Sequence, residues 1–137
     1  MSRMVMDTGP LVAWLCPRDR HHAWAVETFQ QLPAGCLVCE AVLAEACHLV
    51  RKDGVDPGRV LAFVERGGLV VVPLGGQVAT LRQLMARYRS VGMDFGDACV
   101  VRLTELHPDI QVCTTDSDFR VYRRHGRQII PLLAPFA

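Results

Sequence analysis

The chain has 137 residues, of which 50% are hydrophobic and 21% charged, and this composition excludes a disordered chain. We expect a single domain over residues 1–137, because a chain of this length can bury a substantial core. The formal net charge is +1, and Lys52 is the only lysine among the 15 lysine and arginine residues. Lys52 is followed by Asp53, and a phosphate-binding P-loop requires a lysine followed by Ser or Thr, so the sequence excludes a P-loop.

The N-terminal half begins with a short apolar run that ends at Met6 and is followed by Asp7, Thr8, Gly9 and Pro10. Such a run is typical of a buried strand that stops at a turn, and Pro10 suits the first turn of a helix. Hydrophobic periodicity and Gly/Pro breaks then predict helices over residues 11–16 and 21–32, a short strand over 36–39 and a helix over 40–52. A further helix is expected from Pro57 to about Arg66, with Asp56 as its cap. The last element of this half is a strand over 69–74 that should be buried on both faces.

The C-terminal half continues the alternation of helices and strands. We expect a helix over residues 77–89 with Arg82, Arg87 and Arg89 facing outward, a helix from about 94 to 106, a strand over 110–113, a helix opened by Asp116 and Asp118 that runs to about His125, and a last strand at 129–130 that Pro131 stops. Strands that alternate with helices throughout predict an α/β fold, in which helices cover both faces of a mostly parallel sheet.

Six cysteines lie mostly among apolar neighbours, which favours reduced thiols in the core. Cys36 and Cys39 have CxxC spacing, but no second pair and no nearby histidine complete a zinc site. The N-terminal apolar run is interrupted by Asp7 and does not resemble a signal peptide. No run approaches the roughly 18 apolar residues of a membrane span, so we expect a soluble cytoplasmic protein without membrane partners.

Four acids occupy positions that such a fold brings to one edge of the sheet. Asp7 and Asp116 each follow an apolar strand, Glu45 lies in the first half of a helix, and Asp97 lies in the first turn of another. Because the neighbours of Glu45 and Asp97 are nearly all apolar, a lone carboxylate at either position would be costly to desolvate. Clustered carboxylate oxygens suit Mg²⁺ or Mn²⁺ rather than zinc.

Each acid also has a purely structural interpretation. Asp7 can cap the following turn, Asp116 or Asp118 can cap the last helix, and Asp97 can stabilise a helix N-terminus together with Asp94. Glu45 can pair with an arginine in the core. These interpretations require four independent coincidences, whereas one metal site explains all four positions.

The acids fall within four segments that resemble the successive motifs of the PIN domain, most closely those of VapC-type toxins of bacterial type II toxin–antitoxin systems. The segments are DTGPL at residues 7–11, AEA at 44–46, MDFGDA at 93–98 and TTDSDF at 114–119. The resemblance implies a three-layer α/β/α sandwich with a central, mostly parallel, twisted sheet. One departure is Glu40, where many relatives carry a small hydroxyl residue.

The resemblance also implies a metal-dependent endoribonuclease that hydrolyses RNA phosphodiester bonds as the toxin of an antitoxin pair. Its catalytic and metal-binding quartet would be Asp7, Glu45, Asp97 and Asp116, with Mg²⁺ or Mn²⁺ as the cofactor. Asp118 matches a less regular additional acid, and Thr8 and Thr114 are expected to support the site. The family further implies a cognate antitoxin and a homodimer.

RNA must approach this acidic site, so cations are expected along its path. Two groups of arginines are candidates for holding phosphates, Arg120, Arg123 and Arg124 after the last acid, and Arg18 and Arg20 after the first helix. The alternative is that each group is a solvated helix face. Trp14, Trp24 and Phe29 can line a groove for the antitoxin or fill the core, and the core is favoured.

Two other functions are compatible with parts of the pattern. A non-catalytic PIN-like scaffold would bind RNA or protein without cutting. An aspartyl-phosphate receiver or phosphatase typically needs a lysine near the end of the sheet, but the C-terminal half contains none. Such phosphatases also carry a second aspartate two residues after the first, where this chain has Gly9.

Overall fold

A five-stranded parallel sheet forms the centre of the computed structural model, which describes residues 3–136. The strand order is β3-β2-β1-β4-β7, so β1 lies in the middle. The strands are β1 (Arg3–Met6), β2 (Cys36–Val38), β3 (Leu69–Val71), β4 (Ile110–Cys113) and β7 (Leu132–Leu133). β1 pairs with β4 over its whole length, from Arg3 opposite Ile110 to Met6 opposite Cys113. The register places the residues that follow β1 and β4 side by side.

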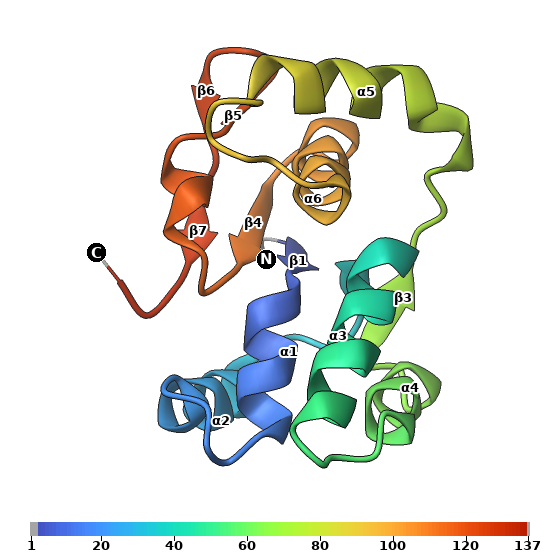
Figure 1. Cartoon of the computed structure of the whole chain (residues 1–137), viewed down its shortest axis with the longest axis vertical. Helices are drawn as coiled ribbons and strands as arrows, with labels where there is room; N and C mark the ends of the chain where they lie inside the picture. Colours follow the sequence, from blue (N-terminus) through green and yellow to red (C-terminus); the bar gives the residue numbers. More distant parts are fainter. Residues whose placement is uncertain (1–2, 137) are drawn as a thin grey trace.

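Six α-helices within the described residues connect the strands. They are α1 (Thr8–Leu15), α2 (His22–Gln31), α3 (Glu40–Lys52), α4 (Gly58–Glu65), α5 (Val78–Arg87) and α6 (Phe95–Leu106). The chain first moves from β1 through β2 to β3 and then returns past β1 to β4. Right-handed connections therefore place α1 to α4 on one face and α5 with α6 on the other (Figure 1). The predicted three-layer α/β/α fold is confirmed.

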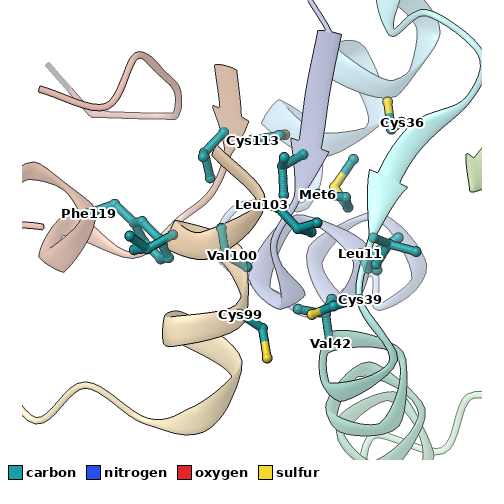
Figure 2. Packing of buried hydrophobic residues seen from close by; sticks show 14 of the residues in the cluster. Met6, Leu11, Cys36, Cys39, Val42, Cys99, Val100, Leu103, Cys113 and Phe119 are labelled. Atoms are coloured by element: carbon teal, nitrogen blue, oxygen red, sulfur yellow. The ribbon is translucent and has the colours of Figure 1, made fainter. Parts of the chain in front are cut away.

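The core is built around β1, whose Val5 and Met6 are fully buried. Side chains from α1, α3 and α6, among them Leu11, Val42 and Leu103, gather near the end of this strand (Figure 2). All six cysteines are free thiols, and only Cys47 is not fully buried, as expected of core thiols. The aromatic side chains of the early helices also pack against the core: the ring of Trp14 stacks on Phe29 at 4.5 Å, and Trp24 packs nearby.

The helix over residues 40–52 forms as predicted, because its stripe of Val42, Ala46 and Val50 is buried. α4 begins at Gly58, one residue after the predicted start, and Asp56 Oδ1 accepts a hydrogen bond of 2.9 Å from the Gly58 N–H. None of the helices in the part of the chain that the structure describes is long and apolar enough to cross a membrane.

The strand predicted over residues 69–74 is wrong in length and in burial. β3 covers only Leu69–Val71, and the Val70 side chain is 49% exposed. The physical reason is its place at the edge of the sheet, where only β2 pairs with it. Its continuous β-branched pattern predicted a strand buried on both faces, and the sequence of one strand does not reveal which strands and helices lie beside it.

The predicted helix from Asp116 to about His125 is also wrong. Residues Ser117–Arg120 form a single 3₁₀ turn, and β5 (Arg123–Arg124) then pairs antiparallel with β6 (Gln128–Ile129). Phe119 and Tyr122 are both buried, and their spacing of three residues suits a 3₁₀ turn as well as an α-helix. His125 and Gly126 have φ values of 51° and 80°, which turn the chain back instead of continuing a helix.

The last predicted strand is displaced rather than absent. Residues 129–130 do not form a strand of the central sheet; Ile129 belongs to β6 and is 73% exposed. Pro131 does not end the pairing, because its carbonyl accepts a hydrogen bond of 2.9 Å from the Val112 N–H. The chain then forms β7 at the edge of the sheet, where a preceding proline is tolerated.

Candidate active site

An open pocket of about 520 Å³ lies beyond the carboxyl ends of β1 and β4. The connections of the sheet change direction between these two strands, which is where open α/β sheets bind ligands. The acids that line the pocket are Asp7, Asp19, Glu45, Asp94, Asp97, Asp116 and Asp118. The fold therefore brings together the four acids of the predicted quartet, together with Asp118.

Asp7 directly follows β1, and its backbone N–H donates a 3.0 Å hydrogen bond to the Cys113 carbonyl of β4. Only 7% of the residue is exposed. Although Asp7 stands at the N-cap position of α1, its side chain makes no capping hydrogen bond there; Oδ2 instead accepts one of 2.7 Å from the Thr114 hydroxyl. Burial, with smaller contributions from the charges of Asp116 and Glu45, raises the pKa of Asp7 to about 6, although the Thr114 hydrogen bond opposes the rise. Capping alone thus does not explain this carboxylate.

Thr114 joins the ends of the two central strands. Its buried hydroxyl donates to Asp7 Oδ2 and accepts a hydrogen bond of 2.9 Å from the Asp116 N–H. The adjoining turns approach so closely that a Cβ atom on Gly9 would lie 1.9 Å from Thr115 Oγ1. Thr8 is buried and lines the same pocket. The hydroxyl predicted to support the last acid therefore also orients the first.

Asp97 acts in the cap of α6 and also faces the pocket. Asp94 Oδ1 accepts a hydrogen bond of 2.8 Å from the Asp97 N–H, and Asp97 Oδ2 accepts one of 3.2 Å from the Asp94 N–H. The Tyr122 hydroxyl donates to Asp97 Oδ2 at 3.1 Å. Burial raises the pKa of Asp97 to about 7, the charges of Asp94 and Asp7 add to the rise, and the Tyr122 hydrogen bond opposes it. The helix cap and the pocket thus share one carboxylate.

The other two predicted acids differ in their surroundings. Asp116 Oδ1 accepts a hydrogen bond of 2.9 Å from the Asp118 N–H, so Asp116 caps the 3₁₀ turn while lining the pocket. Glu45 is solvent-exposed on α3. The expectation that Glu45 is buried among apolar side chains is wrong, because residues 44 and 45 lie on the outer side of the helix beside the pocket.

Of the predicted arginines, Arg20 is the one that lines the acidic pocket, where its Nε donates a 3.0 Å hydrogen bond to His21 Nε2. Arg18 lies in the adjoining pocket and pairs with Asp53 at 3.0 Å. Arg123 bonds to carbonyls of its own turn, among them that of Arg120 at 2.7 Å. Arg124 reaches the Thr104 and His107 carbonyls beside the end of α6. Arg120 lies over the Phe136 ring at 4.9 Å.

The pocket also contains a residue that the sequence did not single out. Asp19 lies in the turn between α1 and α2, and its Oδ1 accepts a hydrogen bond of 2.9 Å from the His21 N–H. Its surroundings in the sequence, Pro17 to Arg20, read only as a polar turn. Only the packing of α1 against α3 brings this turn to the acids.

Comparisons with known proteins identify the family to which this parallel sheet and its acidic pocket belong. The PIN domain family model matches residues 4–124. The chain belongs to the PIN domain family. No curated protein sequence matches it. This chain is similar to the crystal structure of Mycobacterium tuberculosis VapC20, which is described as a sarcin–ricin loop cleaving toxin. The TM-score is 0.79 and the sequence identity is 16%, and the match covers 93% of this chain and 99% of VapC20. The two share the PIN fold.

The donor set of this PIN domain has the chemistry of a site for a hard divalent cation. All its side-chain donors are carboxylate or hydroxyl oxygens except those of Arg20 and His21. Burial is the main cause of the raised pKa values of Asp7 and Asp97, and the neighbouring carboxylates contribute to both rises. Within residues 3–136, however, no three ligand-type side chains are close enough to form a ready-made metal cluster. The chemistry of the residues fits such an ion.

Proposed function

We propose that this PIN domain is a metal-dependent endoribonuclease that hydrolyses RNA phosphodiester bonds as the toxin of a type II toxin–antitoxin pair. The observation that carries the proposal is the convergence of Asp7, Glu45, Asp97 and Asp116 on one pocket. The fold shared with VapC20, a toxin that cleaves the sarcin–ricin loop, supports the same activity.

Asp7, Asp97 and Asp116 would hold Mg²⁺ or Mn²⁺, with Glu45 and Asp118 as further oxygen donors from the rim. When bound, the ion would polarise the phosphodiester and lower the pKa of the attacking water. Thr114 holds Asp7 in place, and Tyr122 holds Asp97, through hydrogen bonds of 2.7 and 3.1 Å. Such outer partners orient carboxylates and keep them from rotating away from a ligand.

The exposed position of Glu45 gives it a separate task. A carboxylate at the rim can accept the proton of the attacking water without the desolvation cost that Asp7 bears. Arg20 lies on the rim as well and can hold an RNA phosphate beside the acids. A cognate antitoxin would regulate the enzyme in the cytoplasm, where its RNA substrate is found, and the protein would form a homodimer.

The test compares RNA cleavage by the wild-type protein with that by Asp7→Asn and Asp97→Asn in the presence of Mn²⁺. We expect both variants to lose at least about 100-fold in cleavage rate, while circular dichroism shows an intact fold. Glu27→Gln, which removes an exposed acid of α2 that does not line the pocket, is the matched control and should cut normally. Undiminished cleavage by both aspartate variants would refute the assignment.

A non-catalytic PIN scaffold is the second candidate, and the lack of a ready-made cluster of metal ligands in the described residues favours it. Calorimetric titration with Mn²⁺ separates the two functions. An enzyme should bind Mn²⁺ with an affinity that falls in Asp7→Asn. A scaffold should show no heat of binding and no RNA cleavage, but still bind RNA or protein.

A further inference from the structure

A second, more apolar groove of about 770 Å³ adjoins the acidic pocket. Its apolar surface comes from α5 and from the start of α6, namely Val78, Leu81, Met85, Met93 and Phe95. Gly92 and Asp94 line both cavities, so the groove continues directly from the acids. A chain that crosses the acidic pocket can therefore extend into this groove.

Phe95 stands at the junction of the two cavities. It is the first residue of α6, immediately after the cap Asp94 and two residues before Asp97. Its side chain is 51% exposed, and within residues 3–136 the ring contacts no other aromatic ring. The capping box fixes the start of α6 and therefore the position of Phe95 relative to the acids. Such an exposed, well-positioned ring is suited to stacking with a flat ligand.

Two arginines flank this apolar surface. Arg82 lies in the middle of α5 and Arg89 two residues beyond its end, and both line the groove together with Met85. Both are exposed, and in the described chain neither guanidinium has a hydrogen bond or an ion pair. Arg87, on another side of the helix, is instead held by the Gly126 carbonyl at 2.7 Å.

We propose that this groove binds the unpaired nucleotide next to the scissile phosphodiester, with its base stacked on Phe95 and its phosphates held by Arg82 and Arg89. The inference rests on the proposed ribonuclease function. Charge complementarity favours RNA as the occupant: Arg20 lies on the acidic pocket, and Arg82 with Arg89 lies on the adjoining groove. A polyanion that crosses seven acids needs cations on either side of them. The groove volume is also that of a ligand site for a flat, partly apolar group.

The experiment first maps the cut that the wild-type protein makes in total bacterial RNA. A short RNA that spans this cut is then used for single-turnover kinetics with Phe95→Ala and with the double variant Arg82→Gln/Arg89→Gln. Controls come from α4: Leu61→Ala removes a side chain that is also 51% exposed, and Arg59→Gln removes an exposed arginine outside both cavities. Melting temperatures confirm that each variant folds.

We expect Phe95→Ala to weaken RNA binding by about 5- to 150-fold, the range found when a stacked base loses its aromatic partner. The arginine variant should bind more weakly and lose salt dependence, by about 0.7 in the slope of log affinity against log salt for each phosphate contact. The decisive readout is RNA with an abasic nucleotide next to the cut. It should bind the wild-type protein as weakly as the intact RNA binds Phe95→Ala, and Phe95→Ala should add no further loss.

The outcomes separate this inference from the proposed function. If the wild-type protein cuts RNA but Phe95→Ala and the arginine variant match the controls, the groove does not bind RNA and the nuclease assignment stands. Additive losses for the abasic RNA and Phe95→Ala overturn the stacking contact. If Phe95→Ala leaves cleavage unchanged but alters the mass measured by sedimentation, the groove is a contact between copies of the chain. Absence of any cleavage by the wild-type protein refutes the function itself.

Discussion

The Thr114 hydroxyl lies 2.7 Å from Asp7 Oδ2 and joins two residues that are 107 positions apart in the chain. The same hydroxyl accepts a hydrogen bond from the Asp116 N–H. One buried oxygen thus fixes two acids of the pocket relative to each other. The parallel register of β1 and β4 makes this contact possible, because it brings the ends of the two strands together.

The first prediction concerns this hydroxyl. Thr114→Val keeps the shape of the buried side chain but removes both hydrogen bonds, so we expect the free energy of unfolding to fall by about 1–3 kcal/mol. Mn²⁺ affinity should fall by about 10- to 100-fold, because Asp7 loses its orienting partner. Thr114→Ser retains the hydroxyl and should keep most of the affinity. Urea unfolding and calorimetry measure the two effects, and equal Mn²⁺ affinity in both variants would contradict this role.

The second prediction is that the metal-free protein loses stability as the pH rises. The pKa of Asp7 is raised to about 6 and that of Asp97 to about 7, both from an ordinary value of 3.8. Between the ordinary pKa of 3.8 and the raised values, the folded state holds protons that the unfolded chain has released. The free energy of unfolding therefore falls as the pH increases from about 4 to 7. The part due to Asp7 is at most about 3 kcal/mol.

Urea unfolding in EDTA at pH 5 and pH 8 checks this pH dependence. Asp7→Asn should reduce the difference between the two pH values, because the neutral amide has no charge to bury. Asp109→Asn is the control: Asp109 is exposed, and its φ of 56° is one that asparagine readily adopts. A wild-type protein that is equally stable at both pH values would show that the carboxyl groups are not destabilised by burial.

The third prediction concerns the Tyr122 hydroxyl, which donates to Asp97 Oδ2 and lowers its pKa. Tyr122→Phe should raise the pKa of Asp97 by about one pH unit, because hydrogen bonds to a charged group are worth about 1.5 kcal/mol or more. Half-maximal Mn²⁺ binding should move to higher pH accordingly. Tyr88→Phe, which removes a hydroxyl bonded to the Arg123 N–H, is the matched control and should leave this pH unchanged. Carboxyl NMR titration follows Asp97 directly.

The fourth prediction is a clash that a second substitution relieves. Gly9→Ala places a methyl group 1.9 Å from Thr115 Oγ1, next to Asp116, and should cost about 1–3 kcal/mol in the free energy of unfolding. Thr115→Ala removes this oxygen, although its Cβ would remain at 3.2 Å. The double variant should therefore be more stable than Gly9→Ala alone. Strictly additive losses in thermal unfolding would show that the two turns are not in contact.

Several features could be read from the sequence because local patterns determine them. The apolar run before Asp7 predicted the buried strand β1, since a short continuous apolar run that ends at Gly and Pro is typical of a buried strand. The apolar stripe of Val42, Leu43, Ala46, Leu49 and Val50 predicted the helix α3, and Asp53-Gly54 predicted its end. The acids Asp7 and Asp116 were found because each follows a strand, and parallel strands end at the same edge of a sheet.

Other features depended on neighbours that are distant in the chain. Val70 is exposed because β3 lies at the edge of the sheet, and Glu45 faces solvent although its neighbours in the sequence are apolar. Residues 116–125 form a 3₁₀ turn and the first strand of a hairpin, in which the ring of Tyr122 packs against Phe119 and against Tyr88 at the end of α5. Burial is a property of the packed chain, so a single segment cannot reveal it.

The sequence by itself therefore determined the alternation of strands and helices as far as β4, the four acids of the predicted quartet and the edge of the sheet at which they meet. Only the tertiary structure decided which acids are buried, that Thr114 holds Asp7, and that Phe95, Arg82 and Arg89 line a groove beside them. Periodicity and turn residues act over a few positions, whereas desolvation and hydrogen bonding at the pocket depend on contacts between residues as much as 107 positions apart.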